Sequence, residues 1–370
     1  MKILYLTNQF YLHGGIEKML SQKINYLISE FGHDVILCTS EHDNKEFIYP
    51  VNESLKHIDL GIDYIKSKSY FHPINLIKAF KHYRVLKKFI KTEQPDIIIS
   101  INKTPEEFFI PFIEKHIPKV KEFHSSGVIF GNSKSLFGKF KHQLFNIFSQ
   151  YDSLVVLNED EKQYYPFNNV TVIPNFIKIG SNVAIAEKQK TIIAAGRIAP
   201  IKQFDHLINV WSQIATEFPD WQVKIFGDGD PELMDNLNQL ILDLNVPNVI
   251  MMGQTAHLKK EMEKASVFAM TSATECFPMV LLEAQDAGMA LISYDCPNGP
   301  RNIIKDKITG ILTQHNSIDD FAKSLESLLL DAQKREKLGE QAHLEVIEFS
   351  EQHIMSKWQN LFMDLINYDV

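Results

Sequence analysis

The sequence has 370 residues, of which 45% are hydrophobic and 23% charged, and its net charge is −8. These values are typical of a soluble globular protein with two domains, and they exclude an intrinsically disordered chain. The acidic net charge counts against nucleic-acid binding. No apolar run reaches the ~20 residues of a membrane-spanning helix. Three cysteines without a CxxC pair predict reduced thiols in the cytoplasm rather than a disulfide framework.

The first half of the chain alternates short apolar runs with longer amphipathic stretches. Residues 1–7 predict a first strand rather than a signal peptide, because Asn8 and Gln9 interrupt the apolar run at once. Further strands are predicted at 35–38, 97–101, 120–123 and 154–157, and helices at 16–29, 74–90, 106–115 and 136–148. Continuous apolar strands that alternate with helices indicate a parallel sheet covered on both faces.

The same alternation begins again after a polar junction at about 173–190. Strands are predicted at 191–195, 221–226, 249–252, 267–271, 290–294 and 310–312, with helices at 202–218, 232–244 and 279–287. The sequence therefore predicts two doubly wound, Rossmann-like α/β domains, 1–175 and 191–349, that face a central cleft. Ligands of such sheets bind at the carboxyl ends of the strands, where the strand order reverses. The last residues, 350–368, have the apolar spacing of an amphipathic helix.

The charges are unevenly distributed between the two halves. Residues 1–175 hold 21 Lys and Arg against 19 Asp and Glu, whereas the remainder holds 17 against 27. Much of the basic charge lies in the stretches 66–91 and 134–141. Two interpretations stay open: these are solvated helix faces, or they form a patch that attracts anionic lipid headgroups or a phosphate-bearing acceptor.

The first loop that is a candidate for ligand binding contains Gly14 and Gly15, after the first strand and at the start of the next helix. Paired glycines at a helix N-terminus let backbone N–H groups approach a phosphate, and the helix dipole favours its negative charge. A tight turn would use the same residues. The GxGxxG fingerprint of dinucleotide-binding enzymes is absent here, which counts against an NAD enzyme.

Two cations follow the first strand of the second half. Arg197 lies just past the strand end, and Lys202 is predicted to begin the next helix. An Arg fork and a Lys point charge form a suitable clamp for a diphosphate, and they would stabilise the charge on a departing one. The alternative is two ordinary surface cations.

The most specific element places Glu275 and Glu283 with seven residues between them. Glu275 follows a strand, Pro278 is predicted to open a helix, and Glu283 stands in an otherwise apolar run. A carboxylate among apolar residues needs a specific partner, and a ribose diol suits it. The N–H groups of Cys276, Phe277 and Met279 are predicted to receive a sugar or phosphate. The alternative is a capping acid and a salt-bridged helix acid.

Taken in order, these elements resemble the retaining glycosyltransferases of the GT-B fold, family 4 or "group 1", over essentially the whole chain. The residues that carry the resemblance are Gly14-Gly15-x-Glu17, Glu122-Phe123-His124, Pro174-Asn175, Gly196-Arg197 with Lys202, the Gly227-Asp228-Gly229 turn, Glu275 with Glu283, and the 295–300 loop. Two departures are Cys276, where the family usually has Gly, and Asn302, where an acid is common. The Asp228-Gly-Asp230 triplet matches the family's turn, so no metal site is expected.

The resemblance implies a role for each matching residue. Gly15, with Gly14 beside it, would give an N–H to the donor phosphate, Arg197 and Lys202 would hold the diphosphate, and Glu275 would bind donor-sugar hydroxyls. Cys276, Phe277 and Met279 would lie along the donor, Glu283 would bind its ribose, and His124 would assist at the reacting centre. The C-terminal helix, 350–370, would pack onto the first domain.

The implied activity is retaining, metal-independent transfer of a hexose or N-acetylhexosamine from a UDP-sugar to a glycan or lipid-linked glycan, with no cofactor. Peripheral membrane contact through the basic first domain is a further expectation. The alternatives are another GT-B enzyme, such as an NDP-sugar epimerase, or a non-catalytic module that binds nucleotide sugars.

Overall fold

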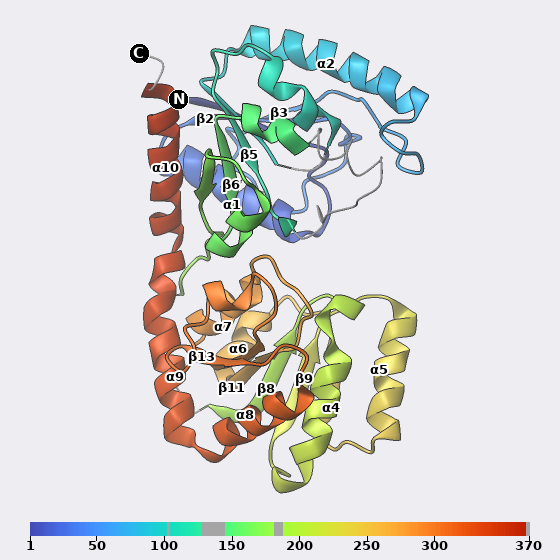
Figure 1. The fold of residues 1–370 in the computed structure, drawn as a ribbon, viewed down its shortest axis with the longest axis vertical. Coiled ribbons are helices and arrows are strands. Elements are labelled where there is room, and N and C mark those ends of the chain that lie inside the picture. Colours follow the sequence, from blue (N-terminus) through green and yellow to red (C-terminus); the bar gives the residue numbers. More distant parts are fainter. Residues whose placement is uncertain (102–103, 128–144, 181–187, 368–370) are drawn as a thin grey trace. The chain divides into compact units, whose positions relative to one another are not determined.

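The computed structural model describes residues 1–101, 104–127, 145–180 and 188–367. The chain divides into two compact units. Unit 1 consists of Met1–Pro174 together with Ile354–Val370, and unit 2 consists of Asn175–His353. In the described part of each unit, a parallel β-sheet is combined with helices from the segments between its strands (Figure 1).

The described strands of unit 1 form a parallel sheet in the order β3-β2-β1-β4-β5-β6-β7. Their bounds are Lys2–Thr7 (β1), Asp34–Thr39 (β2), Lys56–Asp59 (β3), Ile97–Ser100 (β4), Lys119–Glu122 (β5), Ser153–Val156 (β6) and Val170–Val172 (β7). Strands β1, β2 and β4 are almost entirely buried, which agrees with their continuous apolar runs.

The helices of unit 1 follow the predicted periodicity. Among the described residues these α-helices are α1 (Gly15–Ser29), α2 (Pro73–Glu93) and α10 (Glu351–Asn367), whose first turn begins in unit 2. Helix α10 buries Ile354, Trp358 and Phe362, which lie on one helical face. Gln359 of α10 makes a 2.8 Å hydrogen bond to His33, beside β2.

The described strands of unit 2 form a second parallel sheet in the order β10-β9-β8-β11-β12-β13. Their bounds are Gln189–Ala195 (β8), Gln222–Phe226 (β9), Val249–Gly253 (β10), Ala265–Met270 (β11), Ala290–Tyr294 (β12) and Gly310–Thr313 (β13). The helices are Phe204–Ile214 (α4), Pro231–Asp243 (α5), Leu258–Lys264 (α6), Met279–Asp286 (α7), Ile318–Leu330 (α8) and Ala332–Glu345 (α9). Trp211 on α4 and Phe321 on α8 are fully buried in the core of this unit.

Three predicted helices differ from the structure. The segment 106–115 forms two short 3₁₀ helices, Pro105–Phe108 and Ile110–Phe112, because Pro111 lacks an N–H and disfavours helical backbone at the residue before it. The predicted helix 202–218 begins later, at Phe204, since Gln203 has a φ of 47°. Of the predicted helix 136–148, most lies outside the described residues, as does the basic stretch 134–141; the described part enters the 3₁₀ helix Asn146–Gln150.

Both strand orders reverse beside the first strand of the unit. In unit 1 the reversal lies between β1 and β4, and in unit 2 it lies between β8 and β11. Loops that leave the carboxyl ends of these strands are where doubly wound sheets bind their ligands. Arg197 and Lys202 follow β8, and Glu275 follows β11, so these predicted site residues come together at the reversal in unit 2.

Candidate functional site

The loop after β8 is held against the loop after β9 by close backbone contacts. Gly227 has a φ of +156°, and a Cβ there would lie 1.9 Å from the Gly196 carbonyl oxygen. A Cβ on Gly229 would lie 2.0 Å from the Ile198 carbonyl oxygen. Real Cβ atoms do not approach so closely, so these positions require glycine. The turn therefore fixes the path of the backbone on both sides of Arg197.

The two cations differ in how far they are fixed. Arg197 is exposed and makes no hydrogen bond or ion pair with any residue that the structure describes. Lys202 ends the 3₁₀ helix Pro200–Lys202 rather than opening α4. Its backbone carbonyl and that of Gln203 accept hydrogen bonds from Thr271 Oγ1, at 3.3 and 2.8 Å. The Lys202 backbone is thereby tied to the end of β11.

An ion pair joins the loops that follow β8 and β11. Lys202 Nζ lies 2.5 Å from Glu275 Oε1, which also accepts a 2.7 Å hydrogen bond from Ser272 Oγ. Both contacts use the same carboxylate oxygen, so Glu275 Oε2 has no hydrogen-bond partner among the described side chains. The Lys202 ammonium has three N–H groups, and Glu275 takes one of them. The pair thus keeps both an acceptor and two donors for a ligand.

A second tight backbone contact positions Glu275. The backbone at Glu275 pairs with the 295–300 loop through a parallel bridge between Glu275 and Asn298. A Cβ on Gly299 would lie 2.5 Å from the Glu275 Cβ and 3.0 Å from Pro278 Cδ. Glycine at 299 is therefore needed for the two loops to lie against each other.

The residues after Glu275 lead into α7. Met279 is the first helical residue, as in the predicted range 279–287, and Pro278 is the N-cap rather than the first residue of the helix. As a first helical residue, Met279 has no partner within the helix for its N–H. The Phe277 side chain is buried and packs against Phe349, with ring centroids 5.8 Å apart. Cys276 is partly exposed, so the backbone here accepts a Cβ in place of the usual glycine.

Glu283 lies in the second turn of α7 and is partly exposed. Its neighbours Leu281, Leu282 and Ala284 are fully buried. The carboxylate therefore stands at the border between the apolar side of α7 and solvent, where a polar ligand can reach it.

The acidic triplet after β9 has local structural roles. Asp228 Oδ1 accepts a 2.8 Å hydrogen bond from the Gly229 N–H, and Asp230 Oδ1 caps α5 by accepting from the Glu232 N–H at 2.9 Å. Within the described residues, no group of three or more His, Cys, Asp and Glu side chains has the arrangement of a metal site.

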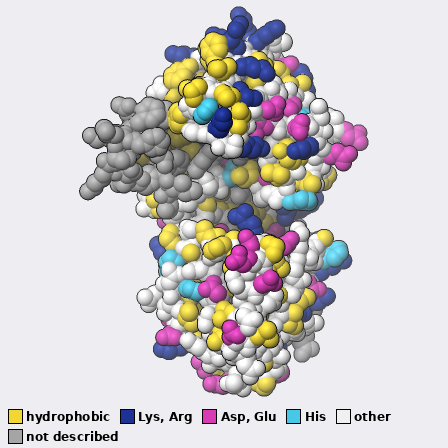
Figure 2. Space-filling view, turned by 90° about the vertical axis from the view of Figure 1, so that its right-hand side faces the viewer, with side chains coloured by type: hydrophobic (Ala, Val, Ile, Leu, Met, Phe, Trp, Pro, Cys, Tyr) yellow, Lys and Arg dark blue, Asp and Glu magenta, His cyan; other side chains and the backbone are white. Residues whose placement is uncertain are grey.

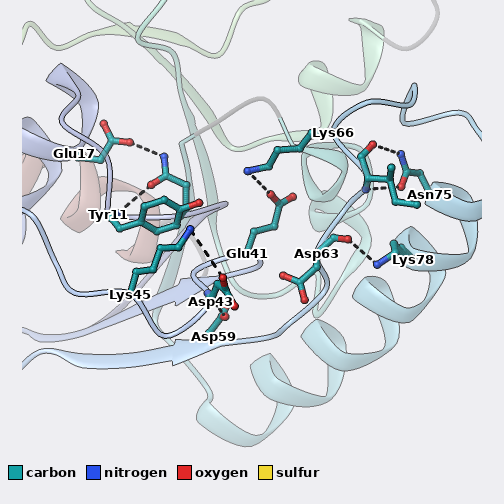
Figure 3. A network of polar contacts seen from close by, with 12 residues as sticks. Tyr11, Glu17, Glu41, Asp43, Lys45, Asp59, Asp63, Lys66, Asn75 and Lys78 are labelled. Carbon is teal, nitrogen blue, oxygen red and sulfur yellow. Dashed lines mark hydrogen bonds and ion pairs between the residues drawn. The ribbon is translucent and has the colours of Figure 1, made fainter.

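In unit 1, Gly14 is the N-cap of α1 and Gly15 its first residue. A Cβ on Gly14 would lie 2.0 Å from Glu17 Oε2, so this glycine makes room for the Glu17 carboxylate. Gln9 Nε2 donates a 2.7 Å hydrogen bond to Glu17 Oε1 and holds it there (Figure 3). A Cβ on Gly15 would meet no atom within 4 Å, so the fold itself does not require glycine at this position.

His124 follows β5 and belongs to a buried charged group. Its Nε2 lies 3.1 Å from Glu122 Oε1, and Lys23 Nζ forms an ion pair with the same oxygen. Lys23 also lies over the Trp358 ring of α10, 3.8 Å from its centroid. Burial by itself would raise the pKa of Glu122, but Lys23 and His124 lower it to about 2. Burial also lowers the pKa of Lys23, which Glu122 opposes.

An ionised Glu122 fixes the orientation of the His124 ring, because the carboxylate accepts a hydrogen bond that Nε2–H donates. No role was predicted from the sequence for Lys23, Glu122 or Ser272, although Glu122 belongs to the Glu122-Phe123-His124 motif. A signal for Glu122 exists: the segment Lys119–Glu122 has three charged residues within a strand that is fully buried. Buried charges need partners.

Fold and sequence now define the class of protein. The chain has the GT-B architecture of two doubly wound parallel α/β domains. The family model described as glycosyl transferases group 1 matches residues 176–345, and that of glycosyltransferase family 4 matches residues 13–180. The chain belongs to family 4 of the glycosyltransferases, the "group 1" enzymes, and is a glycosyltransferase.

Two curated proteins are similar to this chain in different ways. An exopolysaccharide phosphotransferase of Streptomyces coelicolor is 34% identical over 224 residues, which are 58% of this chain and 24% of that protein. The amylovoran biosynthesis glycosyltransferase AmsD of Erwinia amylovora is 24% identical over 375 residues, which are 97% of this chain and 99% of that protein. The first of these is thus matched over about a quarter of its length.

Solved structures share the fold. TarM of S. aureus matches with a TM-score of 0.79 at 17% identity, and the match covers 98% of this chain and 98% of TarM. HepE of Anabaena in complex with UDP has a TM-score of 0.75 at 17% identity, over 99% of this chain and 100% of that one. At such identities the likeness concerns the fold, and the predicted fold class is confirmed.

Proposed function

We propose that this glycosyltransferase moves a hexose or an N-acetylhexosamine from a UDP-sugar to a glycan or lipid-linked glycan acceptor in the biosynthesis of a surface polysaccharide. The transfer retains the anomeric configuration and uses neither a metal ion nor another cofactor. One observation carries the proposal: the Lys202–Glu275 pair and the exposed Arg197 gather where the strand order of unit 2 reverses. The UDP bound to HepE and the polysaccharide named for AmsD support the nucleotide and the pathway class.

Each part of the UDP-sugar has a partner in the protein in this proposal. Arg197 and the two remaining N–H groups of Lys202 hold the diphosphate oxygens. Glu275 Oε2 accepts from hydroxyls of the donor sugar, and Glu283 accepts from the ribose diol. The N–H groups of Met279, Cys276 and Phe277 lie along the same segment as Glu275, and they donate to the sugar or the phosphate.

The cation pair also explains how the bond breaks without a metal. As the bond between the sugar C1 and the phosphate oxygen breaks, its electron pair stays with the diphosphate. Arg197 and Lys202 stabilise this growing charge. The acceptor hydroxyl attacks C1 from the same face, and its proton passes to an oxygen of the departing phosphate. His124, oriented by Glu122, contributes at the reacting centre.

The proposed place of the reaction is the cytoplasm, at the inner face of the membrane. All three cysteines, Cys38, Cys276 and Cys296, are free thiols, which supports a reducing compartment. Among the described residues, no helix is both long and apolar enough to cross a bilayer.

The nucleotide assignment is tested by thermal unfolding with UDP, GDP, ADP, CDP and TDP. We expect UDP to raise the melting temperature most, because a ligand at 100 times its Kd stabilises the protein by about 2.7 kcal/mol. Arg197→Ala should reduce the shift given by UDP. An equal shift with all five nucleotides, or no shift with any, would contradict the assignment of a UDP donor.

Gly15 separates a structural from a functional role at the first helix. Because a Cβ on this residue meets nothing within 4 Å, we expect Gly15→Ala to melt at the wild-type temperature. If its N–H serves the donor phosphate, the added methyl should still raise the KM for the UDP-sugar, measured from initial rates. Unchanged kinetics would remove Gly15 from the donor site.

A further inference from the structure

Helix α2 and the loop before it carry a group of large hydrophobic side chains that face solvent. The exposed members are Tyr70, Phe71, Ile74, Leu76, Ile77 and Phe80. Ile77 and Phe80 are 72% and 64% exposed. In the space-filling view, hydrophobic side chains gather at the level that α2 has in Figure 1, with Lys and Arg side chains among and above them (Figure 2). Such a concentration is uncommon on a surface that meets only water.

These residues are not required to hold α2 in place. The inner side of the helix buries Asn75, His82, Leu86 and Ile90. The His82 ring is within 3.1 Å of the Tyr64 hydroxyl and packs against Phe109. The helix is therefore anchored through a separate face, and the apolar residues at 74, 77 and 80 remain for contact with something else.

The loop before α2 is built to present its aromatic residues. Asn75 Oδ1 accepts from the Ile65 N–H at 3.0 Å, and Asn75 Nδ2 donates to the carbonyls of Ile65, Lys68 and Ser69 at 3.0–3.3 Å. The Tyr70 ring packs edge-on against Tyr64. This fully used buried amide fixes the loop, so Tyr70 is held at the surface.

The same segment is strongly basic. Residues 66–93 contain eight Lys and Arg and a single acid, Glu93. Lys66, Lys78 and Lys81 bond to groups of unit 1 itself (Figure 3). The side chains of Arg84, Lys87, Lys88 and Lys91 form no hydrogen bond or ion pair with the described residues, although those of Arg84 and Lys87 lie over aromatic rings. Residues 77, 84, 88 and 91 recur at helical spacing, so the apolar and basic parts share one outward face.

We propose that the outward face of α2, with Tyr70 and Phe71, is the surface by which this enzyme docks on a bilayer that contains anionic lipids. Exposed aromatic and aliphatic side chains enter the headgroup region, and the cations bind lipid phosphates along the C-terminal half of the helix. Docking at this surface would bring the enzyme to a lipid-linked acceptor. Only this link to the acceptor rests on the proposed function; the docking surface itself does not.

The combination of groups favours a bilayer over other anionic partners. A nucleic acid would meet the cations but leave Ile74, Ile77 and Phe80 in water. A second copy of this acidic chain would bury the apolar residues together with a like-charged helix. A bilayer surface satisfies both, because its interior is apolar and its headgroups are negative.

The test is co-sedimentation of the full chain with vesicles of phosphatidylcholine alone or mixed with phosphatidylglycerol, without any nucleotide. We expect binding to the mixed vesicles. Ile77→Ser/Phe80→Ser should weaken it on the order of tenfold or more through lost apolar burial, and Arg84→Gln/Lys88→Gln by a similar factor through lost charge. The matched control is Leu242→Ser/Leu330→Ser in unit 2, where both leucines are 71% exposed; it should bind like the wild type.

Three outcomes would overturn the docking surface: no binding to mixed vesicles, equal binding of the α2 variants, or an equal loss in the control. Dimerisation that Ile77→Ser/Phe80→Ser abolishes, with no vesicle binding, would assign the face to a second copy instead. All variants should keep the wild-type melting temperature and its response to UDP. If UDP did not raise the melting temperature of the wild type, the proposed donor would be contradicted, and the vesicle result would stand separately.

Discussion

Replacement of Lys202 by alanine is expected to lower kcat by about 100-fold or more, while unit 2 melts near its wild-type temperature. The ammonium stabilises charge that forms only as the diphosphate departs, so its loss raises the barrier. The side chains of its ion pair with Glu275 keep 21% and 13% exposure, so solvent can still reach the carboxylate, and the melting temperature should change much less than kcat. The measurement is UDP release from UDP-glucose and UDP-N-acetylglucosamine with a glycan acceptor, and melting by circular dichroism.

Lys190→Ala is the matched control for Lys202→Ala. Lys190 lies on β8, the strand that leads to the site, and makes a single exposed ion pair with Asp220. Its removal should leave kcat unchanged. If Lys202→Ala turned over at the wild-type rate, the diphosphate would have to be held elsewhere. A sugar that changes without any acceptor would identify an epimerase instead.

Replacement of Lys23 by methionine is expected to destabilise unit 1 by about 3–5 kcal/mol, because Glu122 then stays buried without its cation. The double variant Lys23→Met/Glu122→Gln should recover part of the loss, since neither charge remains. Trp358 is the only tryptophan of unit 1, so its fluorescence in urea follows this unit in a variant without Trp211 and Trp221. Additive losses in the double variant would mean that the two groups do not form one pair.

The same pair predicts a dependence on acid. The pKa of Glu122 is about 2 in the folded unit and about 4.3 in an unfolded chain, so its contribution is present above pH 4.3. That contribution is lost as the pH falls from about 4.3 to about 2. Wild-type stability should therefore decline more steeply across this window than that of Glu122→Gln, and parallel profiles would contradict an ionised, buried Glu122.

Much of the fold follows from local patterns. Strands such as Ala290–Tyr294 (β12) and helices such as α1 and α2 were predicted because a buried strand or an amphipathic helix leaves a clear apolar signature. Strand Lys56–Asp59 (β3) was missed, because an edge strand with partly exposed polar residues has no such run. Its identity depends on pairing with β2, which sequence spacing does not contain.

The candidate site was predictable where residue type and chain order carry the information. Arg197, Lys202 and Glu275 come after strand ends, and parallel sheets bring those ends to one edge. The ion pair between Lys202 and Glu275 was not predicted, since it depends on how two loops far apart in sequence meet. Likewise, only the fold brings Lys23 from α1 to Glu122 at the end of β5.

Unit 1 combines residues that precede and residues that follow unit 2 in the sequence, whereas unit 2 is continuous. During synthesis, unit 2 therefore has all of its residues before unit 1 does. Until Trp358 leaves the ribosome, Lys23 lacks the ring that covers it, and the apolar face of α10 is absent from unit 1. Unit 1 therefore stays incomplete until helix α10 has been synthesised. In that interval the nascent chain would gain most from the protection of a chaperone.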